Sequence, residues 1–469
     1  MLAGRTQTRD IREEKRKMMK RLTLAAAAIA SFGAIAGGEL DDAHLIGTTD
    51  KERAIDYEAG ETMKFTLALK NAKPFPAGAY FIKWTRTGDD GVRQEGKAEL
   101  SAESPLVLQT SIDRPGFVRI VAVVVDAAGK AYAKSLNVDA ATPEGRAALN
   151  RWERADKRVF FDGGAAVHPE RLRSVPEPED FDEFWARRKA RLAKVPLDPK
   201  VKFEREDSNS KVYTFEVKCA GPRPVTGWYT VPKREGRFPA TICFHGYGAH
   251  FVQTVPNGGP ADRIKMFINA HGYELGREEE YYTEFYNSIM SNGKTFALDS
   301  AWQNKSTDTA YFGWMCYRIM RALQFLKSMP EWDGRELVAS GGSMGGLQTV
   351  WAAGLDPDVT VAEPAIPWCC DIGGRETLKR NGGGVGETEA LRYFDPVNLA
   401  KRVSRKCRFN ITRAGLGDYT CPPSGIAVLF NNLPCDKTVK WVQGSTHGHV
   451  PPGGLGNQEF TVHEPAAGR

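Results

Sequence analysis

Long apolar runs, concentrated charge and paired cysteines are scarce in this chain of 469 residues. The apolar stretch at residues 22–35 is 14 residues long, short of the ~20 that a membrane-spanning helix needs. Residues 1–36 hold eight Lys and Arg against three acidic residues, which leaves 56 basic against 55 acidic residues in the rest of the chain. This balance gives no electrostatic case for a nucleic-acid partner, which would need a concentrated basic face.

The eight cysteines are too dilute for a disulfide scaffold, and no two of them have the C-x-x-C spacing of zinc and redox sites. Internal repeats and low-complexity blocks are also missing from the sequence. With 41% hydrophobic and 26% charged residues, the composition is that of a globular protein that can bury a large core. The length allows two or three domains.

The N-terminus contains the pattern of a secretory signal peptide. A basic segment, Lys15 to Arg21, precedes the apolar stretch, and Ala34-Ile35-Ala36 supplies a small-x-small cleavage site. We therefore expect residues 1–36 to be a signal peptide, the protein to be secreted or periplasmic, and no stable membrane insertion after cleavage. A permanent transmembrane anchor is the weaker alternative.

Residues 45–139 have the pattern of successive strands. Residues 62–70 alternate apolar and polar side chains, residues 79–85 are aromatic and β-branched, and residues 117–125 are rich in Val, with Gly, Pro and Asp turns between. This pattern predicts a small all-β domain, an immunoglobulin-like sandwich of six or seven strands, at residues 44–150. It carries no catalytic cluster, and core packing explains its aromatic residues better than sugar binding does.

Residues 151–200 are expected to form a connector, with a turn at residues 160–164 and a short helix at residues 181–192. From residue 201 onward, buried strand-like runs alternate with helical stretches such as residues 317–326. This alternation predicts an α/β domain with a mostly parallel sheet over residues 201–469. The predicted strands are residues 212–217, 226–231, 240–244 and 266–270.

A nucleophile is predicted within this α/β domain. Residues 337–340 have the pattern of a buried strand, residues 347–353 that of a helix, and between them Gly341-Gly342-Ser343-Met344-Gly345 contains G-x-S-x-G. A strand, this motif and a helix together make a nucleophile elbow, in which glycines allow a strained turn that exposes the serine hydroxyl at a helix N-terminus. We therefore expect Ser343 to be the catalytic nucleophile.

A serine hydroxyl needs a base to take its proton, and the base needs an orienting carboxylate. In the hydrolase order of serine, acid and histidine, three of the eight histidines remain: His447, His449 and His463. His447 follows a plausible last strand at residues 439–442, so we expect it to be the base, with His449 the open alternative. His463 lies in a polar tail and is unattractive.

The acid is expected at Asp418, in the loop after a predicted strand at residues 409–414. Catalytic groups in open α/β sheets gather at the carboxyl ends of strands, and Asp418 has that position. Its rival role is a turn or cap before the helix that starts near Pro423. Asp395 and Asp436 are weaker candidates, because no buried strand precedes either of them.

The developing oxyanion needs two backbone N–H donors. One is expected from Met344, the residue after the nucleophile. The other is expected from Tyr247, in the loop His245-Gly246-Tyr247-Gly248 that follows the early strand at residues 240–244. An ordinary turn is the alternative for this loop.

Taken with these residues, the chain from about residue 176 to 447 resembles the acetyl xylan esterase and cephalosporin C deacetylase family of α/β-hydrolases. The resemblance implies Ser343 as nucleophile, Asp418 as acid, His447 as base, and Tyr247 with Met344 as oxyanion donors. The motifs that carry it are PEDFDEFW at residues 178–185, GY at 246–247, YR at 317–318, GGSMGG at 341–346, YFDPVN at 393–398 and GDYTCPP at 417–423.

The chain departs from the family pattern in four places. His271-Gly272-Tyr273 stands where the family usually has Arg-Gly-Gln, so the family's pocket shape and oligomerisation are not carried over. Met344 replaces a frequent Gln, although only its backbone is needed. The segment after Pro451 is a polar tail without helical periodicity, and the N-terminal β-domain lies outside the minimal family fold.

The sequence thus predicts a secreted serine esterase that removes short acyl groups, chiefly acetyl, from carbohydrate or similar small esters. The expected partner is a small-molecule or glycan ester; no metal or organic cofactor is implied, and oligomer formation stays open. One alternative is a serine peptidase of the prolyl oligopeptidase type, but a propeller of ~40–50 residues per blade does not fit the N-terminal region. Another is a carbohydrate-binding protein with an inert hydrolase domain.

Overall fold

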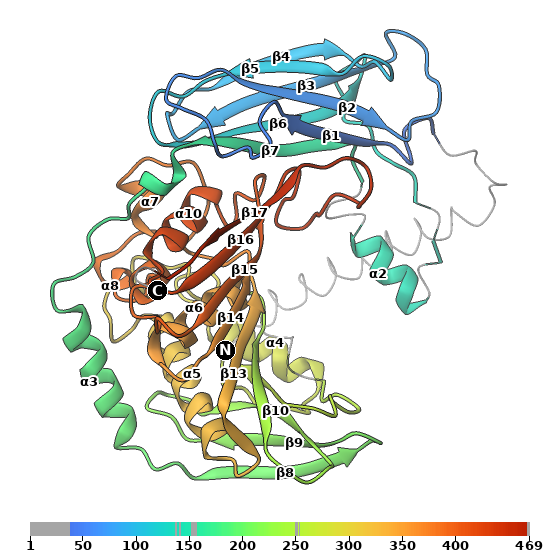
Figure 1. The fold of residues 1–469 in the computed structure, drawn as a ribbon. Coiled ribbons are helices and arrows are strands. Elements are labelled where there is room, and N and C mark those ends of the chain that lie inside the picture. The colour runs from blue at the N-terminus through green and yellow to red at the C-terminus, as the bar shows by residue number, and fades with distance from the viewer. Residues whose placement is uncertain are drawn as a thin grey trace, which may run out of the picture.

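The computed structural model describes residues 38–466 except 137, 140, 141, 152–156, 249–251 and 253. The predicted signal peptide at residues 1–36 lies outside the described residues. The described chain forms an N-terminal all-β domain that lies against one end of a larger α/β domain (Figure 1). Among the described residues, no helix combines the length and the apolar character that a membrane crossing requires.

The β-domain contains two antiparallel sheets. In β2 the buried residues alternate with exposed or half-buried ones, as expected for a strand with one face in the core. Ring atoms of Phe161 lie close to Gly47 of the other sheet, so the two sheets pack on one another. The all-β character is therefore confirmed, whereas the immunoglobulin-like topology stays a prediction. In order across each sheet, the strands are β1 (His44–Thr49), β2 (Met63–Lys70) and β5 (Leu106–Thr110), and β4 (Gln94–Glu99), β3 (Tyr80–Gly88), β6 (Gly116–Asp126) and β7 (Phe160–Val167).

Strand β7 corrects one sequence prediction. Residues 160–164 were expected to turn within a connector, but they run as a strand that pairs antiparallel with β6 from Gly116↔Val167 to Val123↔Phe160. Gly163 and Gly164 lie inside this strand because other chain segments approach them closely: a Cβ on Gly164 would stand 2.3 Å from the Val118 carbonyl oxygen. Glycine within a strand can mark such an approach rather than a turn.

A ten-stranded sheet organises the α/β domain. Its six central strands, β16 to β12 in sheet order, run parallel, while the strands at both edges are antiparallel. The mostly parallel sheet is thus confirmed at its centre. Across the sheet the strands are β17 (Glu459–Glu464), β16 (Asp436–Val442), β15 (Arg408–Gly415), β14 (Val361–Ala365), β13 (Trp332–Gly342), β11 (Phe238–Phe244), β12 (Ile264–Asn269), β10 (Val225–Pro232), β9 (Ser210–Val217) and β8 (Pro199–Glu206).

Helices join the strands of this sheet. Helices α5 and α6 pack on each other and on the central strand β13, and every residue of α6 is buried. The polar tail predicted after Pro451 ends in β17, which pairs with β16. The helices are α2 (Pro143–Arg151), η2 (Pro169–Arg171), α3 (Phe181–Ala193), α4 (Glu279–Ser288), α5 (Tyr311–Ser328), α6 (Met344–Leu355), α7 (Gly373–Glu376), α8 (Glu389–Arg392), α9 (Pro396–Ala400) and α10 (Pro423–Asn432).

Candidate active site

Ser343 lies at the turn between β13 and α6, at the carboxyl end of a central strand. Its backbone has φ 58° and ψ −118°, a conformation that non-glycine residues rarely adopt. Three backbone hydrogen bonds hold this strained residue: its N–H donates to Ala365 (3.0 Å), and its carbonyl accepts from Leu347 (3.0 Å) and Trp368 (3.1 Å). The geometry is that of a nucleophile elbow.

The glycines around Ser343 are required by close backbone contacts. A Cβ on Gly345 would stand 2.4 Å from the Phe244 carbonyl oxygen of β11, and one on Gly341 would stand 2.7 Å from the same atom. Since neither partner is the end of a flexible side chain, neither glycine can carry a side chain without moving backbone. The spacing that the sequence shows around the serine therefore has a direct steric cause.

The three side chains predicted to converge lie in one hydrogen-bonded chain. The hydroxyl of Ser343 donates to Nε2 of His447 at 3.1 Å, and the Nδ1–H of His447 donates to Oδ2 of Asp418 at 3.1 Å. Asp418 is fully buried after β15, and its Oδ1 accepts the backbone N–H groups of Thr420 (3.1 Å) and Cys421 (2.9 Å). The carboxylate is thereby held in one orientation, which selects the tautomer of His447 that can accept the serine proton.

The alternative candidates for the base and the acid lie outside this hydrogen-bonded chain. The ring of His449 packs on Phe160 of β7 at 5.2 Å between ring centroids, and its carbonyl accepts the Thr446 N–H. His463 lies on β17 and pairs with Asp436 at 3.1 Å. Asp395 is the buried cap of α9, where it accepts the backbone N–H groups of residues 371, 372 and 397. Burial, and secondly the charge of a neighbouring aspartate, raises the pKa of Asp395 to about 7.

The loop with Tyr247 follows β11 and lies beside the elbow, since a Cβ on Gly345 would stand 3.2 Å from the His245 carbonyl oxygen. The Tyr247 ring stacks on Phe296 at 4.3 Å, and its hydroxyl donates to the Phe296 carbonyl at 2.7 Å. Met344 is the first residue of α6, and N–H groups of a first helical turn have no partner within the helix. These positions are compatible with the two predicted oxyanion donors, whose role stays a prediction.

Two buried histidines that the sequence analysis did not assign hold this loop. The Gly246 carbonyl accepts from Nδ1–H of His245 at 2.7 Å, and the Gly248 carbonyl accepts from Nε2–H of His271 at 2.9 Å. Burial lowers the pKa of His245 to about 4 and that of His271 well below its usual value, so both are neutral near pH 7. The sequence did mark His271, because it is the first residue of His271-Gly272-Tyr273, which stands where the family usually has Arg-Gly-Gln.

One group of described residues has the ligand types of a metal site. Ligand atoms of Asp418, Cys421 and His447 lie within 4.8 Å of one another, with Cys421 Sγ 3.7 Å from His447 Nδ1. Burial, and secondly the charge of Asp418, raises the pKa of the Cys421 thiol well above its usual value, which disfavours the thiolate that a metal would need. A metal would also take the Nδ1 and carboxylate positions of the hydrogen-bonded chain, so the group fits an acid–base pair better.

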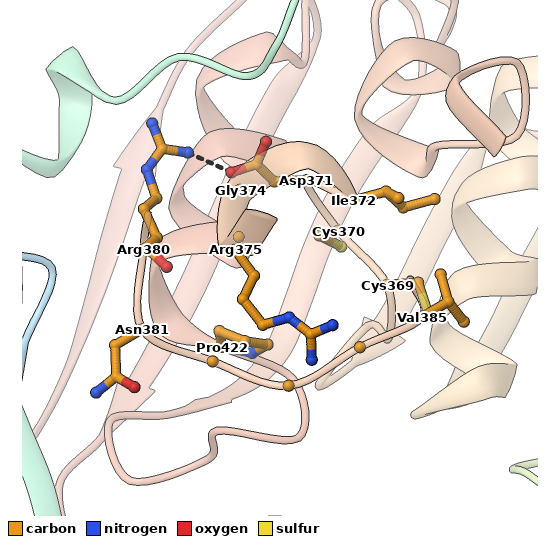
Figure 2. Close-up of a pocket in the computed structure, with 15 residues that line it drawn as sticks. Cys369, Cys370, Asp371, Ile372, Gly374, Arg375, Arg380, Asn381, Val385 and Pro422 are labelled. Carbon is orange, nitrogen blue, oxygen red and sulfur yellow. Dashed lines mark hydrogen bonds and ion pairs between the residues drawn. The ribbon is translucent and has the colours of Figure 1, made fainter. Parts of the chain in front are cut away.

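A pocket is enclosed by the long loop that follows β14 and by the start of α10. Figure 2 shows Arg380 bonded to Asp371 on one side of this loop, with Pro422 close to its glycine run. Burial raises the pKa of Asp371 to about 6, and the charge of Arg380 opposes that rise. Since Pro422 directly follows Cys421, the pocket borders the loop that carries Asp418. Its lining includes the polar side chains of Asp371, Arg380 and Asn381, but not Ser343, Asp418 or His447.

The family model of acetyl xylan esterase matches residues 170–382 and 375–453, which include Ser343, Asp418 and His447. The chain belongs to the acetyl xylan esterase family. The resemblance seen in its motifs is thereby confirmed, and the protein is a carboxylic ester hydrolase.

The chain is also similar to individual proteins. The acetyl esterase Axe7A of Xylanibacter ruminicola is 27% identical over 316 residues, which cover 60% of this chain and 68% of that protein. Among solved structures, acetyl xylan esterase 1 from Thermoanaerobacterium sp. JW/SL YS485 has a TM-score of 0.49 at 23% identity, covering 61% of this chain and 94% of its own. Acetyl xylan esterase from Paenibacillus sp. R4 has a TM-score of 0.48 at 23% identity, covering 60% and 94%.

Proposed function

We propose that this protein removes acetyl groups from carbohydrate esters through an acyl-enzyme intermediate on Ser343. The observation that carries the proposal is the continuous hydrogen-bond chain from Ser343 through His447 to the buried Asp418, with both links at 3.1 Å. Family membership supports an ester of a carbohydrate as substrate. The pattern at residues 1–36 supports action outside the cytoplasm, where polymeric glycans are met.

In the first half-reaction, Oγ of Ser343 attacks the ester carbonyl carbon while Nε2 of His447 takes the hydroxyl proton. The carbonyl oxygen becomes an oxyanion, which the N–H groups of Tyr247 and Met344 would stabilise. Protonated His447 then gives its proton to the departing sugar oxygen, leaving an acetyl ester on Ser343. Asp418 stays ionised throughout and stabilises the charged imidazole.

In the second half-reaction, water replaces the sugar. His447 takes a proton from the water, whose oxygen attacks the acetyl carbon, and the same donors hold the second oxyanion. The proton then passes to Oγ of Ser343, which releases acetate. His447 has 35% of its side chain exposed, which leaves a path for water and for the leaving alcohol.

The proposal is tested by acetate release from acetylated xylo-oligosaccharides and by hydrolysis of 4-nitrophenyl acetate, with Ser343→Ala as control. We expect the wild type to turn over both substrates and Ser343→Ala to be slower by about 10⁴-fold or more. Equal rates for the two proteins would contradict the role of Ser343. A wild type that cleaves methyl esters of uronic acids but no acetyl ester would contradict the substrate class.

A further inference from the structure

The β-domain lies outside the family match at residues 170–453, yet it contacts the loops that carry the acid and the histidine. Figure 1 shows β7 on the side of the β-domain that faces β15 and β16 of the α/β domain. The acid loop, residues 415–421, follows β15, and the histidine loop, residues 443–449, follows β16. Both of these loops have contacts with β7 or with its neighbour β6.

The first contact joins β7 to the histidine loop. The Gln443 side chain accepts the Gly164 N–H through Oε1 and donates to the Gly164 carbonyl through Nε2, each at 2.8 Å. Gln443 is 1% exposed and lies four residues before His447. A buried amide that satisfies both backbone groups of one residue fixes position and orientation together, because a shift would leave buried polar groups unpaired.

The second contact joins β6 and β7 to the acid loop. Arg119 forms two hydrogen bonds with Asp162, at 2.8 and 2.6 Å, and its guanidinium lies 4.2 Å from the ring centre of Tyr419. Tyr419 is the residue directly after Asp418. The planar, charged guanidinium of Arg119 therefore packs on the acid loop by stacking on the aromatic ring of Tyr419, while Asp162 holds the guanidinium in place.

The third contact is between backbones. A Cβ on Gly417 would stand 1.9 Å from the Asp162 carbonyl oxygen, so the acid loop runs directly against β7. The two loops are also bonded to each other, since the Gly417 N–H donates to the Ser445 carbonyl at 3.0 Å. Movement of either loop would therefore disturb the other, and both loops are supported by β7.

Charge couples this support to the acid. Burial raises the pKa of Asp162, and the charge of Asp418 adds to that rise, while the hydrogen bonds from Arg119 oppose it. For Arg119, burial lowers the pKa, but Asp162, Tyr419 and Asp418 outweigh it and raise the pKa overall. Arg119 thus offsets two carboxylates that would otherwise repel each other close to the active site.

From these contacts we propose that the β-domain holds the Asp418 and His447 loops in register with Ser343, with Arg119, Asp162 and Gln443 as positioning residues. The inference rests on the proposed function for its kinetic readout only. None of the three side chains reaches the reacting atoms, so each acts through the loop it supports. The β-domain is then part of the catalytic framework and not merely an attached module.

The test uses the full chain and two matched double variants. Arg119→Met with Asp162→Asn, called the interdomain variant, removes the β-domain pair that packs against the acid loop, without leaving a buried charge unpaired. Arg86→Met with Asp90→Asn removes another shielded bidentate pair of the β-domain, whose Arg has its further hydrogen bonds to Thr110, Val92 and Ser111 of the same domain. We measure kcat and KM for 4-nitrophenyl acetate, the melting temperature, and amide hydrogen exchange of residues 415–421 and 443–449.

For the interdomain variant we expect kcat to fall about 10- to 100-fold with KM within about threefold, because small misplacements of reacting groups act on the chemical step. Hydrogen exchange should rise in both loops. The control variant should lose melting temperature but keep kcat and loop exchange near the wild type. Arg119→Lys, which keeps the charge, should recover part of the lost kcat.

Gln443→Met provides a second route if the interdomain variant does not fold, and it should also lower kcat and raise loop exchange. Unchanged kcat and exchange in the folded interdomain variant, or in Gln443→Met, would overturn the inference while leaving the esterase function standing. Equal kcat losses in the interdomain and control variants would also overturn it. A wild type without esterase activity would refute the proposed function, and loop exchange would still decide the inference.

Discussion

The two halves of the candidate active site are supported in different ways. The nucleophile half consists of the Ser343 elbow and the 245–248 loop, and it is held by the α/β domain alone, through backbone contacts with β11 and through two neutral histidines. The acid–base half consists of the Asp418 and His447 loops, and it is bordered by the β-domain through Gln443 and the Arg119–Asp162 pair. The first half is a local structure, whereas the second is assembled from distant segments.

This difference separates two physical tasks. The strained conformation of Ser343 has to be held by rigid backbone close to it in the sequence, and the strand before it and the buried helix after it provide that backbone. The acid and the histidine need correct relative placement of two long loops, which no short segment can fix. Contacts with the β-domain supply that placement, although no β-domain residue takes part in the chemical steps.

The largest effect is expected from breaking the link within the acid–base half. Asp418→Asn should lower kcat by about 10⁴-fold, because an amide cannot hold His447 in the tautomer that accepts the serine proton. The melting temperature should change little compared with this loss. Steady-state hydrolysis of 4-nitrophenyl acetate and thermal unfolding check both points, and a kcat within tenfold of the wild type would contradict the role of Asp418.

A pair of glycine variants sharpens the comparison. Gly345→Ala places a methyl group against β11 inside the α/β core, so we expect about 100-fold lower kcat together with about 1–3 kcal/mol lower stability. Gly417→Ala places one against the backbone carbonyl oxygen of Asp162, so the acid loop or β7 must move, and we expect a smaller loss of about tenfold because the Ser343 turn itself is not displaced. The measurements are kcat and denaturant unfolding, with Gly453→Ala as control because nothing lies within 4 Å of its added Cβ.

Coupling between sites distinguishes the two halves further. If Gly417→Ala loosens the same interdomain contact that the Arg119–Asp162 pair makes with the acid loop, combining it with Arg119→Met and Asp162→Asn should add little further loss of kcat. The same combination with Gly345→Ala should multiply the two losses. Multiplicative losses in both backgrounds would show that Gly417 does not act through the interdomain contact.

The smallest effect concerns pH and the histidines of the nucleophile half. Their folded pKa values are depressed, so the stability they contribute is present above the unfolded value of about 6.5 and is lost as pH falls toward 4. His271→Gln keeps a donor for Gly248 and an acceptor for Tyr311 but cannot be protonated. Its melting temperature should therefore fall less between pH 6.5 and 4 than that of the wild type, and an equally steep fall would contradict this assignment.

Much of the fold and the site could be predicted from particular residues. The glycines around Ser343 predicted the elbow because their cause is local, within a few residues of the serine. The positions of Asp418 and His447 followed from the rule that catalytic groups lie after parallel strands. The hydrogen bonds between them agree with those expectations.

Other features could not be read from local patterns. Residues 160–164 contain a Gly-Gly pair that is typical of a turn, and only the close approach of Gln443 and Leu416 explains why this segment is a strand. The sequence did not single out His245, and it marked His271 only by the departure from Arg-Gly-Gln, because the Ala270 N–H that bonds His245 and the Gly248 carbonyl that bonds His271 lie on other segments of the chain. Contacts between segments far apart in the chain produce no hydrophobic periodicity and no motif in the sequence.

The sequence by itself determined the strand, turn and helix that could present a nucleophile, the strained turn at Ser343, and a short set of candidates for acid and base. Only the tertiary structure decided among those candidates, placing His447 rather than His449 at the serine hydroxyl and Asp418 behind it. It also decided that the β-domain lies against both loops. The physical reason is that backbone sterics act over a few residues, whereas hydrogen-bond partners and burial are set by segments hundreds of residues apart.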